Sequence, residues 1–247
     1  MSNHSFEKFV KECEEIGISL TKRQVCQFSD YYDCLIEWNE KINLTSITDF
    51  DEVCTKHFID SLMFIKMFES YDDMVSMTFD KSLSDVGTGA GFPGIVLKIL
   101  LPDLNITLMD SLNKRVLFLN EVISKLNLEK ICAVHGRVED LAHDAMYREK
   151  FDFVVARAVA GLPVLCEYCL PFVKKGGSFI AFKSERTGEE VKSAENAMKI
   201  LGGKLSRVCE FTLPNTDYLR TLVRVDKCLN TAKTYPRKAG TPSKKPL

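Results

Sequence analysis

Three glycines, Gly87, Gly89 and Gly91, and one acid, Asp110, could together hold a cofactor that contains adenosine. The glycine-rich stretch 85–94, DVGTGAGFPG, lies between a short apolar segment and a helix that Pro93 could begin. Glycines let the backbone turn sharply and approach a ligand closely, so Gly87 and Gly89 are candidate binding positions. Asp110 ends the next apolar segment, where a carboxylate can accept hydrogen bonds from both ribose hydroxyls.

Two cofactor classes are compatible with this arrangement, because the spacing Gly89-x-Gly91-x-x-Gly94 also matches the dinucleotide fingerprint. An acid, Asp85, lies two residues before the first glycine, and such an acid favours a cationic sulfonium over a pyrophosphate. No basic residue follows the loop until Lys98. These features favour S-adenosylmethionine over a nicotinamide cofactor, although the nicotinamide alternative stays open.

The elements that must position this loop alternate between strand and helix from about residue 80 onward. Such alternation predicts right-handed crossovers and a parallel, doubly wound Rossmann-like sheet. Segments 205–213 and 218–225 are joined by only four residues, so the last strands must pair antiparallel. The expected parallel strands are 83–86, 106–109, 131–134, 151–156 and 178–182. The sequence therefore predicts an α/β fold with an antiparallel last strand.

A helical region precedes this sheet, and a basic tail follows it. Apolar residues recur at helical spacing through residues 1–75, with a possible N-cap at Thr21 and a possible capping box from Asp49 to Glu52. We expect this region to pack on a domain formed by residues 76–226. Residues 227–247 contain six Lys or Arg and no acid, whereas the preceding residues carry a net charge of −7. Such a tail could contact a polyanion or be a solvated terminus, and its composition predicts loose order.

Composition excludes several classes of protein. There is no apolar run long enough for a membrane helix and no N-terminal signal pattern, so we expect a cytoplasmic protein. The nine cysteines are odd in number and lie mostly in apolar segments, which argues against a secreted disulfide scaffold. Cys166 and Cys169 form a C-x-x-C within an apolar helical pattern, but no second close pair could complete a zinc site. We therefore predict core thiols and no metal.

The glycine loop, with its Gly-Phe-Pro-Gly ending, resembles that of the RsmG family, also called GidB, the ribosomal RNA small-subunit methyltransferases G. The segments around His57, Lys114-Arg115 and Arg157, and the tail Tyr235-Pro-Arg-Lys-x-Gly-Thr-Pro242, also match the family in order. The resemblance implies a class I S-adenosylmethionine-dependent methyltransferase that modifies guanine N7 in 16S rRNA. It further implies cofactor contacts from Gly87 and Phe92, adenine contacts from Val138 and Glu139, and a place for Arg157 beside the methyl donor.

Other residues are weaker candidates for contacts with RNA. His57 could contact RNA, or it could pack beside Asp60. Lys183 and Arg186 follow the fifth strand, where open sheets bind ligands, but they could equally belong to a solvated helix face. Arg237 and Lys238 are the candidates within the tail. The expected partner is 16S rRNA or the small ribosomal subunit, and the chain is expected to be a monomer.

The chemistry that the sequence permits agrees with this resemblance. No cysteine follows Pro or Thr, as cytosine C5 methylation would commonly require. The segment after the fourth strand reads RAVA rather than the Pro-Pro-aromatic turn common in exocyclic amine methylation. Guanine N7 has an in-plane lone pair and no proton, so in-line transfer needs positioning and electrostatics but no general base. The alternative is a small-molecule methyltransferase, in which the basic tail would not be needed.

Overall fold

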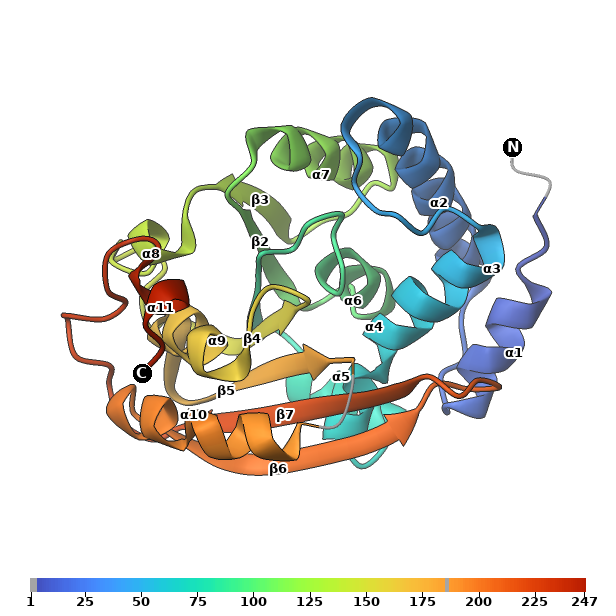
Figure 1. Ribbon diagram of the computed structural model, residues 1–247. Coiled ribbons are helices and arrows are strands. Elements are labelled where there is room, and N and C mark those ends of the chain that lie inside the picture. The colour runs from blue at the N-terminus through green and yellow to red at the C-terminus, as the bar shows by residue number, and fades with distance from the viewer. Residues whose placement is uncertain (1–3, 185–186) are drawn as a thin grey trace.

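A computed structural model describes residues 4–184 and 187–247 and contains one seven-stranded sheet (Figure 1). The strand order is β3-β2-β1-β4-β5-β7-β6, so the chain starts in the middle of the sheet and reverses direction once. The strands are β1 (Ser82–Val86), β2 (Asn105–Asp110), β3 (Ile131–His135), β4 (Phe151–Arg157), β5 (Val173–Lys183), β6 (Gly203–Thr212) and β7 (Leu219–Lys227).

The pairing of these strands confirms the predicted sheet. Strands β1 to β5 pair in parallel, whereas β7 pairs antiparallel with both β5 and β6. The short link between β6 and β7 forces this reversal, as the sequence predicted. The carboxyl ends of β1, β2 and β4 consequently meet at one edge, on either side of the point where the strand order reverses.

Side chains that alternate along the strands pack into two cores. Val155 belongs to a core shared with the N-terminal helices, while Val154 and Ala156 belong to a core on the opposite face. The first core contains residues of α1 (Glu7–Glu15), α2 (Lys22–Ile42), α6 (Gly94–Leu100) and α7 (Asn113–Lys125). The second contains residues of α8 (Val138–Leu141), α9 (Leu162–Cys169), η3 (Leu170–Phe172) and α10 (Gly188–Ile200).

The N-terminal helical region packs directly against the glycine loop. Thr21 caps α2 in a capping box with Gln24, which confirms the predicted N-cap, and Asp49 caps α3 by accepting from the backbone N–H of Glu52, which is one of the two bonds of the predicted capping box. The hydroxyl of Tyr31 in α2 donates to the backbone carbonyl of Ala90. The remaining elements are α3 (Phe50–Val53), the π-helical η1 (Cys54–Ile59), α4 (Asp60–Leu62), η2 (Met63–Met67) and α5 (Tyr71–Thr78), which crosses the expected boundary at residue 75.

The C-terminal segment differs from the loose order that its composition predicted. It returns along α9 and ends in the short helix α11 (Thr241–Lys244), which lies beside α9 in Figure 1. Lys227 is 2% exposed, and its ammonium group donates to the carbonyl of Leu170. The composition of the segment does not predict these contacts, because their partners lie on elements distant in sequence. Within the described residues, no helix combines the length and the apolar character that a membrane span requires.

Candidate cofactor and substrate site

The glycine loop is held in a left-handed backbone conformation at three positions. The φ angles of Gly87, Gly89 and Gly91 are 71°, 61° and 95°, a region that side chains strongly disfavour. A Cβ atom at Gly87 would lie 2.7 Å from a methyl carbon of Val159, so the loop also approaches the end of β4 closely. Glycine at position 87 is therefore required twice, by its backbone conformation and by this close approach.

A buried acid, Asp85, holds the same loop through hydrogen bonds. The carboxylate of Asp85 accepts from the Thr88 hydroxyl at 2.6 Å and from the Gly94 backbone N–H at 2.8 Å. Its other oxygen has no hydrogen-bond partner among the described residues. Burial raises the pKa of Asp85 to about 6, against the hydrogen bonds and the Arg157 charge that lower it. Asp85 thus organises the loop, and it is not among the residues that line the adjacent cavity.

A cavity of about 290 Å³ lies along the carboxyl ends of β1, β2 and β3. Asp110 is 3% exposed and accepts from the backbone N–H groups of Gly89 and Leu112 at 3.0 and 2.9 Å. These bonds fix the carboxylate between the glycine loop and the start of α7. Of the predicted cofactor residues, Gly87, Asp110, Val138 and Glu139 line this cavity, together with Val86, Met109, Ser111, Gly136, Arg137, Val159, Tyr168, Gly240 and Ser243.

A second cavity, of about 260 Å³, lies on the other side of the carboxyl end of β4. Among the described residues that line it, four are Lys or Arg and one is Asp. Ala158, at its wall, directly precedes Val159 at the wall of the first cavity. Ligands in the two cavities could therefore meet across this short segment. The lining consists of Ile47, Lys56, His57, Asp60, Arg157, Ala158, Phe182, Lys183, Ser184 and Arg220.

One carboxylate organises the basic side of the second cavity. Asp60 is 6% exposed and accepts from Arg157 at 2.7 Å through one oxygen and from Arg220 at 2.9 Å through the other. Arg157 also donates to the backbone carbonyl of Lys56 at 3.0 Å, within the π-helical η1. Asp60 therefore fixes two guanidinium groups that come from β4 and β7.

The aromatic ring of Phe92 packs against the same cluster. The rings of His57 and Phe92 stack at 4.5 Å, and the guanidinium of Arg157 lies 5.1 Å from the Phe92 ring centre. Thr45 bonds the Nε2 atom of His57 at 3.0 Å, and Arg157 lies 3.2 Å from its Nδ1 atom. Burial and the Arg157 charge lower the pKa of His57 to about 3, so the imidazole is neutral at physiological pH.

The remaining candidates lie in different places. Gly89 borders the first cavity only through its bond to Asp110, and Phe92 lies behind His57, so a direct role for either stays a prediction. Lys183 lines the second cavity and pairs with Glu190 at 2.8 Å. The described lining of neither cavity includes Arg237 or Lys238, and Arg186 is outside the described residues.

Sequence reasoning assigned no role to several side chains that the fold brings here. Asp60 and Arg220 come from α4 and β7, and Tyr168 comes from the last turn of α9. Only Asp60 had a local signal, since it follows His57 within one helical turn. Arg220 has none, because it reaches the cavity through the antiparallel pairing of β7 with β5.

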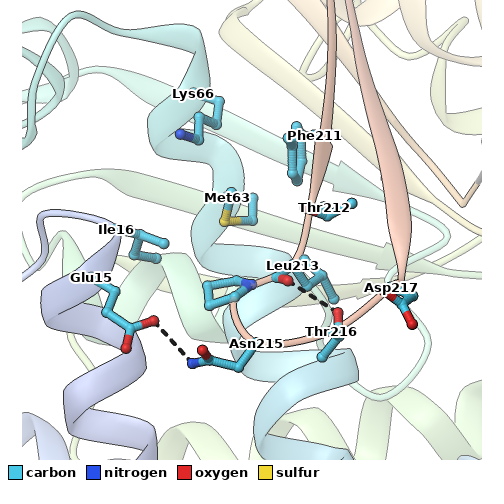
Figure 2. A pocket seen from close by; sticks show the side chains of 11 residues that line it. Glu15, Ile16, Met63, Lys66, Phe211, Thr212, Leu213, Asn215, Thr216 and Asp217 are labelled. Atoms are coloured by element: carbon cyan, nitrogen blue, oxygen red, sulfur yellow. Dashed lines mark hydrogen bonds between the residues drawn. The ribbon is translucent and has the colours of Figure 1, made fainter.

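Another cavity, of about 750 Å³, lies between the end of α1, η2 and the turn that joins β6 to β7 (Figure 2). Asn215 in this turn donates to Glu15 at 3.0 Å, which ties the hairpin to the N-terminal region. No predicted site residue is among its described lining. Cys166 and Cys169 are buried in α9, so their prediction as core thiols is confirmed, and the described residues contain no cluster suited to a metal ion.

Sequence comparison relates this chain to proteins named as ribosomal RNA methyltransferases. One relative, the ribosomal RNA small subunit methyltransferase G of Lachnoclostridium phytofermentans, is 52% identical over 97% of this chain and 96% of its own length. The enzyme of the same name from Alkaliphilus metalliredigens is 50% identical over 95% of each chain.

Solved structures resemble the fold. A mutant of the 16S rRNA (adenine(1408)-N(1))-methyltransferase from Catenulisporales acidiphilia, with its cosubstrate SAM, matches with a TM-score of 0.52 at 17% identity, over 66% of this chain and 93% of that one.

The family model described as rRNA small subunit methyltransferase G matches residues 24–219. The chain therefore belongs to the GidB family of rRNA small subunit methyltransferases G.

Proposed function

We propose that this chain transfers a methyl group from S-adenosylmethionine to N7 of a guanosine in small-subunit ribosomal RNA. The observation that carries the proposal is the pair of cavities separated by Ala158 and Val159 at the end of β4. A methyl donor in one cavity and a base in the other would meet across this segment. Direct transfer requires that the donor and the acceptor lie in line at short distance.

The first cavity fits S-adenosylmethionine. Its described lining contains two acids, Asp110 and Glu139, and one base, Arg137, which suits a ligand that carries a positive sulfur. Asp110 would accept from the ribose hydroxyls, and Val138 and Glu139 would border the adenine. Gly87 lines this cavity at the end of β1, where its positive φ and the close approach of Val159 require a glycine. When bound, the cofactor supplies an electrophilic methyl group on its sulfonium sulfur.

The second cavity fits a nucleotide. Lys56, Arg157, Lys183 and Arg220 surround it, and their charge suits the phosphates of an RNA strand. Arg157 is fixed by Asp60 and by the carbonyl of Lys56, so its guanidinium can orient the base by donating hydrogen bonds. With a pKa of about 3, His57 is a poor proton acceptor. A neutral, weakly basic imidazole agrees with transfer to N7, because that atom carries no proton.

The position of N7 limits the RNA structure that can react. This atom lies on the Hoogsteen edge, which is poorly accessible in the deep and narrow major groove of A-form RNA. We therefore propose an unpaired or distorted guanosine as the target, in 16S rRNA or an assembled small subunit. We further propose that the protein acts as a monomer in the cytoplasm.

Analysis of the methylated RNA tests the proposal. Purified protein, labelled S-adenosylmethionine and small subunits from cells that lack the gene would be incubated, and the extracted RNA treated by mild reduction and aniline. This treatment cleaves the chain at 7-methylguanosine. A single new cleavage at an unpaired guanosine is the expected result, whereas label without cleavage would assign the methyl group to another atom. Label confined to small molecules of a cell extract would favour a small-molecule methyltransferase instead.

A further inference from the structure

The C-terminal segment, residues 231–247, lies against the first cavity rather than the second. Gly240 and Ser243 are among the residues that line the cavity of about 290 Å³. The backbone N–H of Gly240 donates to Glu139 at 3.1 Å, and the Ser243 hydroxyl lies 2.9 Å from that of Tyr168. The segment thus contacts two residues of the cavity wall directly.

A buried ion pair anchors the middle of this segment. Glu167 is fully buried in α9, and its carboxylate accepts from the backbone N–H of Arg237 at 2.8 Å and from its guanidinium at 2.6 to 3.2 Å. A carboxylate without solvent strongly favours retention of its partner. Arg237 is consequently held in the protein and is a poor candidate for contact with a phosphate.

A second arginine fixes the backbone that leads to this pair. The guanidinium of Arg148 donates to the carbonyls of Thr231 and Tyr235 at 2.8 Å and of Ala232 at 3.1 Å. His143 lies 2.8 Å from the carbonyl of Pro236 through its Nε2 atom. Anchors on both sides of residue 236 therefore determine where Gly240 and Ser243 lie.

We infer that this segment is the outer wall of the cofactor site and binds the adenosine end of S-adenosylmethionine. The inference rests on the proposed function, because it takes this cavity as the cofactor site. Asp110, assigned to the ribose, lies at the end of β2, while Gly136, Val138 and Glu139 follow β3. Adenine would accordingly lie toward β3, on the side where Gly240 bonds Glu139. Arg237, one of the basic residues of the segment, then serves to anchor the wall rather than to contact RNA.

A truncation that keeps the anchors tests this inference. Deleting residues 239–247 removes Gly240 and Ser243 but retains Arg237 and the carbonyls that Arg148 binds. Calorimetry with S-adenosylhomocysteine should show at least tenfold weaker binding by the truncated chain. 5′-Methylthioadenosine lacks the amino-acid part and should lose affinity by a similar factor. A matched variant, Lys238→Gln with Lys244→Gln and Lys245→Gln, removes charge without removing the wall and should keep the parent affinity within twofold.

Hydrogen exchange provides a readout that needs no variant. In the unmodified chain, S-adenosylhomocysteine should slow amide exchange in residues 239–245 at least tenfold. Unchanged exchange there, or equal affinity of the truncated and parent chains, would overturn the inference while leaving the proposed function intact. Failure of the parent chain to bind S-adenosylhomocysteine at all would instead overturn the proposed function, and the inference with it.

Discussion

The two cavities at the end of β4 have similar volumes, about 290 and 260 Å³, but opposite charge. The described lining of the first contains two acids and one Arg, whereas that of the second contains four Lys or Arg and one Asp. A cationic donor and a polyanionic acceptor would each be attracted to a different side of the same segment. Charge can therefore separate two ligands where cavity size cannot.

Disruption of the glycine loop should have the largest effect, and only on the first cavity. In Gly89→Val, a β-branched residue would have to adopt a backbone φ of 61°. Space is open there, so the cost is conformational, about 1–2 kcal/mol, and the loop should move away from Asp110. Loss of the bond from the Gly89 N–H to Asp110 adds about 1.5–3 kcal/mol to this cost, so we expect affinity for S-adenosylhomocysteine to fall roughly 100-fold or more by calorimetry.

Gly176→Val is the matched control. Gly176 also has a positive φ, 86°, and open space for a Cβ, but it lies at the far end of β5. The melting temperatures of Gly176→Val and Gly89→Val should fall by similar amounts, while the cofactor affinity of Gly176→Val stays within twofold of that of the parent. Equally weakened binding in both variants would mean that general destabilisation, rather than the loop, abolishes binding.

Removal of Arg157 should have the next largest effect, on turnover. Arg157→Ala leaves Asp60 with Arg220 as its remaining guanidinium partner and removes the donor that faces the base. We expect kcat to fall roughly 100-fold, as for other fixed hydrogen-bond donors, while the KM for RNA changes less than fivefold. Steady-state kinetics on small subunits would measure both. Arg224→Ala, in the same sheet but paired with Asp226, should leave both constants unchanged; a large rise in KM with constant kcat would make Arg157 a binding residue only.

Much of the first cavity was predictable from sequence, because strand ends are local signals. Asp110 ends an apolar segment whose pattern indicates a parallel strand, and such strands direct their ends to one edge, whereas Glu139 was implied by the family resemblance. By contrast, β5 begins at Val173 rather than 178, because Lys174 and Gly176 carry no strand signal of their own. Pairing with β4 and β7 imposes the strand there.

Less of the second cavity and of the C-terminal wall was predictable, because their residues meet only in the folded chain. Arg220 reaches Asp60 across 160 positions, and Arg237 reaches Glu167 across 70. The composition of the segment includes the charge of Arg237, but it does not indicate that Glu167 is the buried partner of this residue. The sequence therefore predicted a loosely ordered segment, either a polyanion contact or a solvated terminus, where the structure contains an anchored segment.

The charge of the second cavity should appear in the salt dependence of RNA binding. Lys56 and Lys183 line this cavity, so Lys56→Gln or Lys183→Gln should reduce the slope of log K against log salt by about 0.7–0.9 for each phosphate that the variant no longer neutralises. Lys238→Gln, at an exposed position of the C-terminal segment, should leave the slope unchanged. Filter binding between about 50 and 200 mM salt would measure it. A reduced slope for Lys238→Gln alone would favour the polyanion contact over the solvated terminus, the two alternatives that composition left open.

Asp85 should discriminate little between charged and neutral ligands of the first cavity. Its carboxylate is buried behind the loop and bonds Thr88 and Gly94, so Asp85→Asn should weaken S-adenosylmethionine and S-adenosylhomocysteine by the same factor. The ratio of their dissociation constants should therefore change less than twofold in calorimetry. A selective weakening of S-adenosylmethionine, more than fivefold, would mean that Asp85 acts on the sulfonium charge after all. The acidity of the cavity would then extend beyond Asp110 and Glu139.

The smallest expected effect concerns pH, and it separates a positioning role of His57 from a proton-transfer role. Burial and Arg157 lower the pKa of His57 to about 3, so the ring stays neutral as the pH changes from 5.5 to 9. Because the folded-state pKa lies below the usual value near 6.5, this group reduces stability only as the pH falls below about 6.5. Single-turnover rates should accordingly show no inflection from His57 over that range. His57→Asn keeps a polar side chain beside Thr45 and should lower the rate without changing the shape of the profile. An inflection near pH 6 to 7 in the parent that disappears in His57→Asn would show that the imidazole exchanges a proton during the reaction, and N7 of guanine, which has none to give, would then be the wrong acceptor.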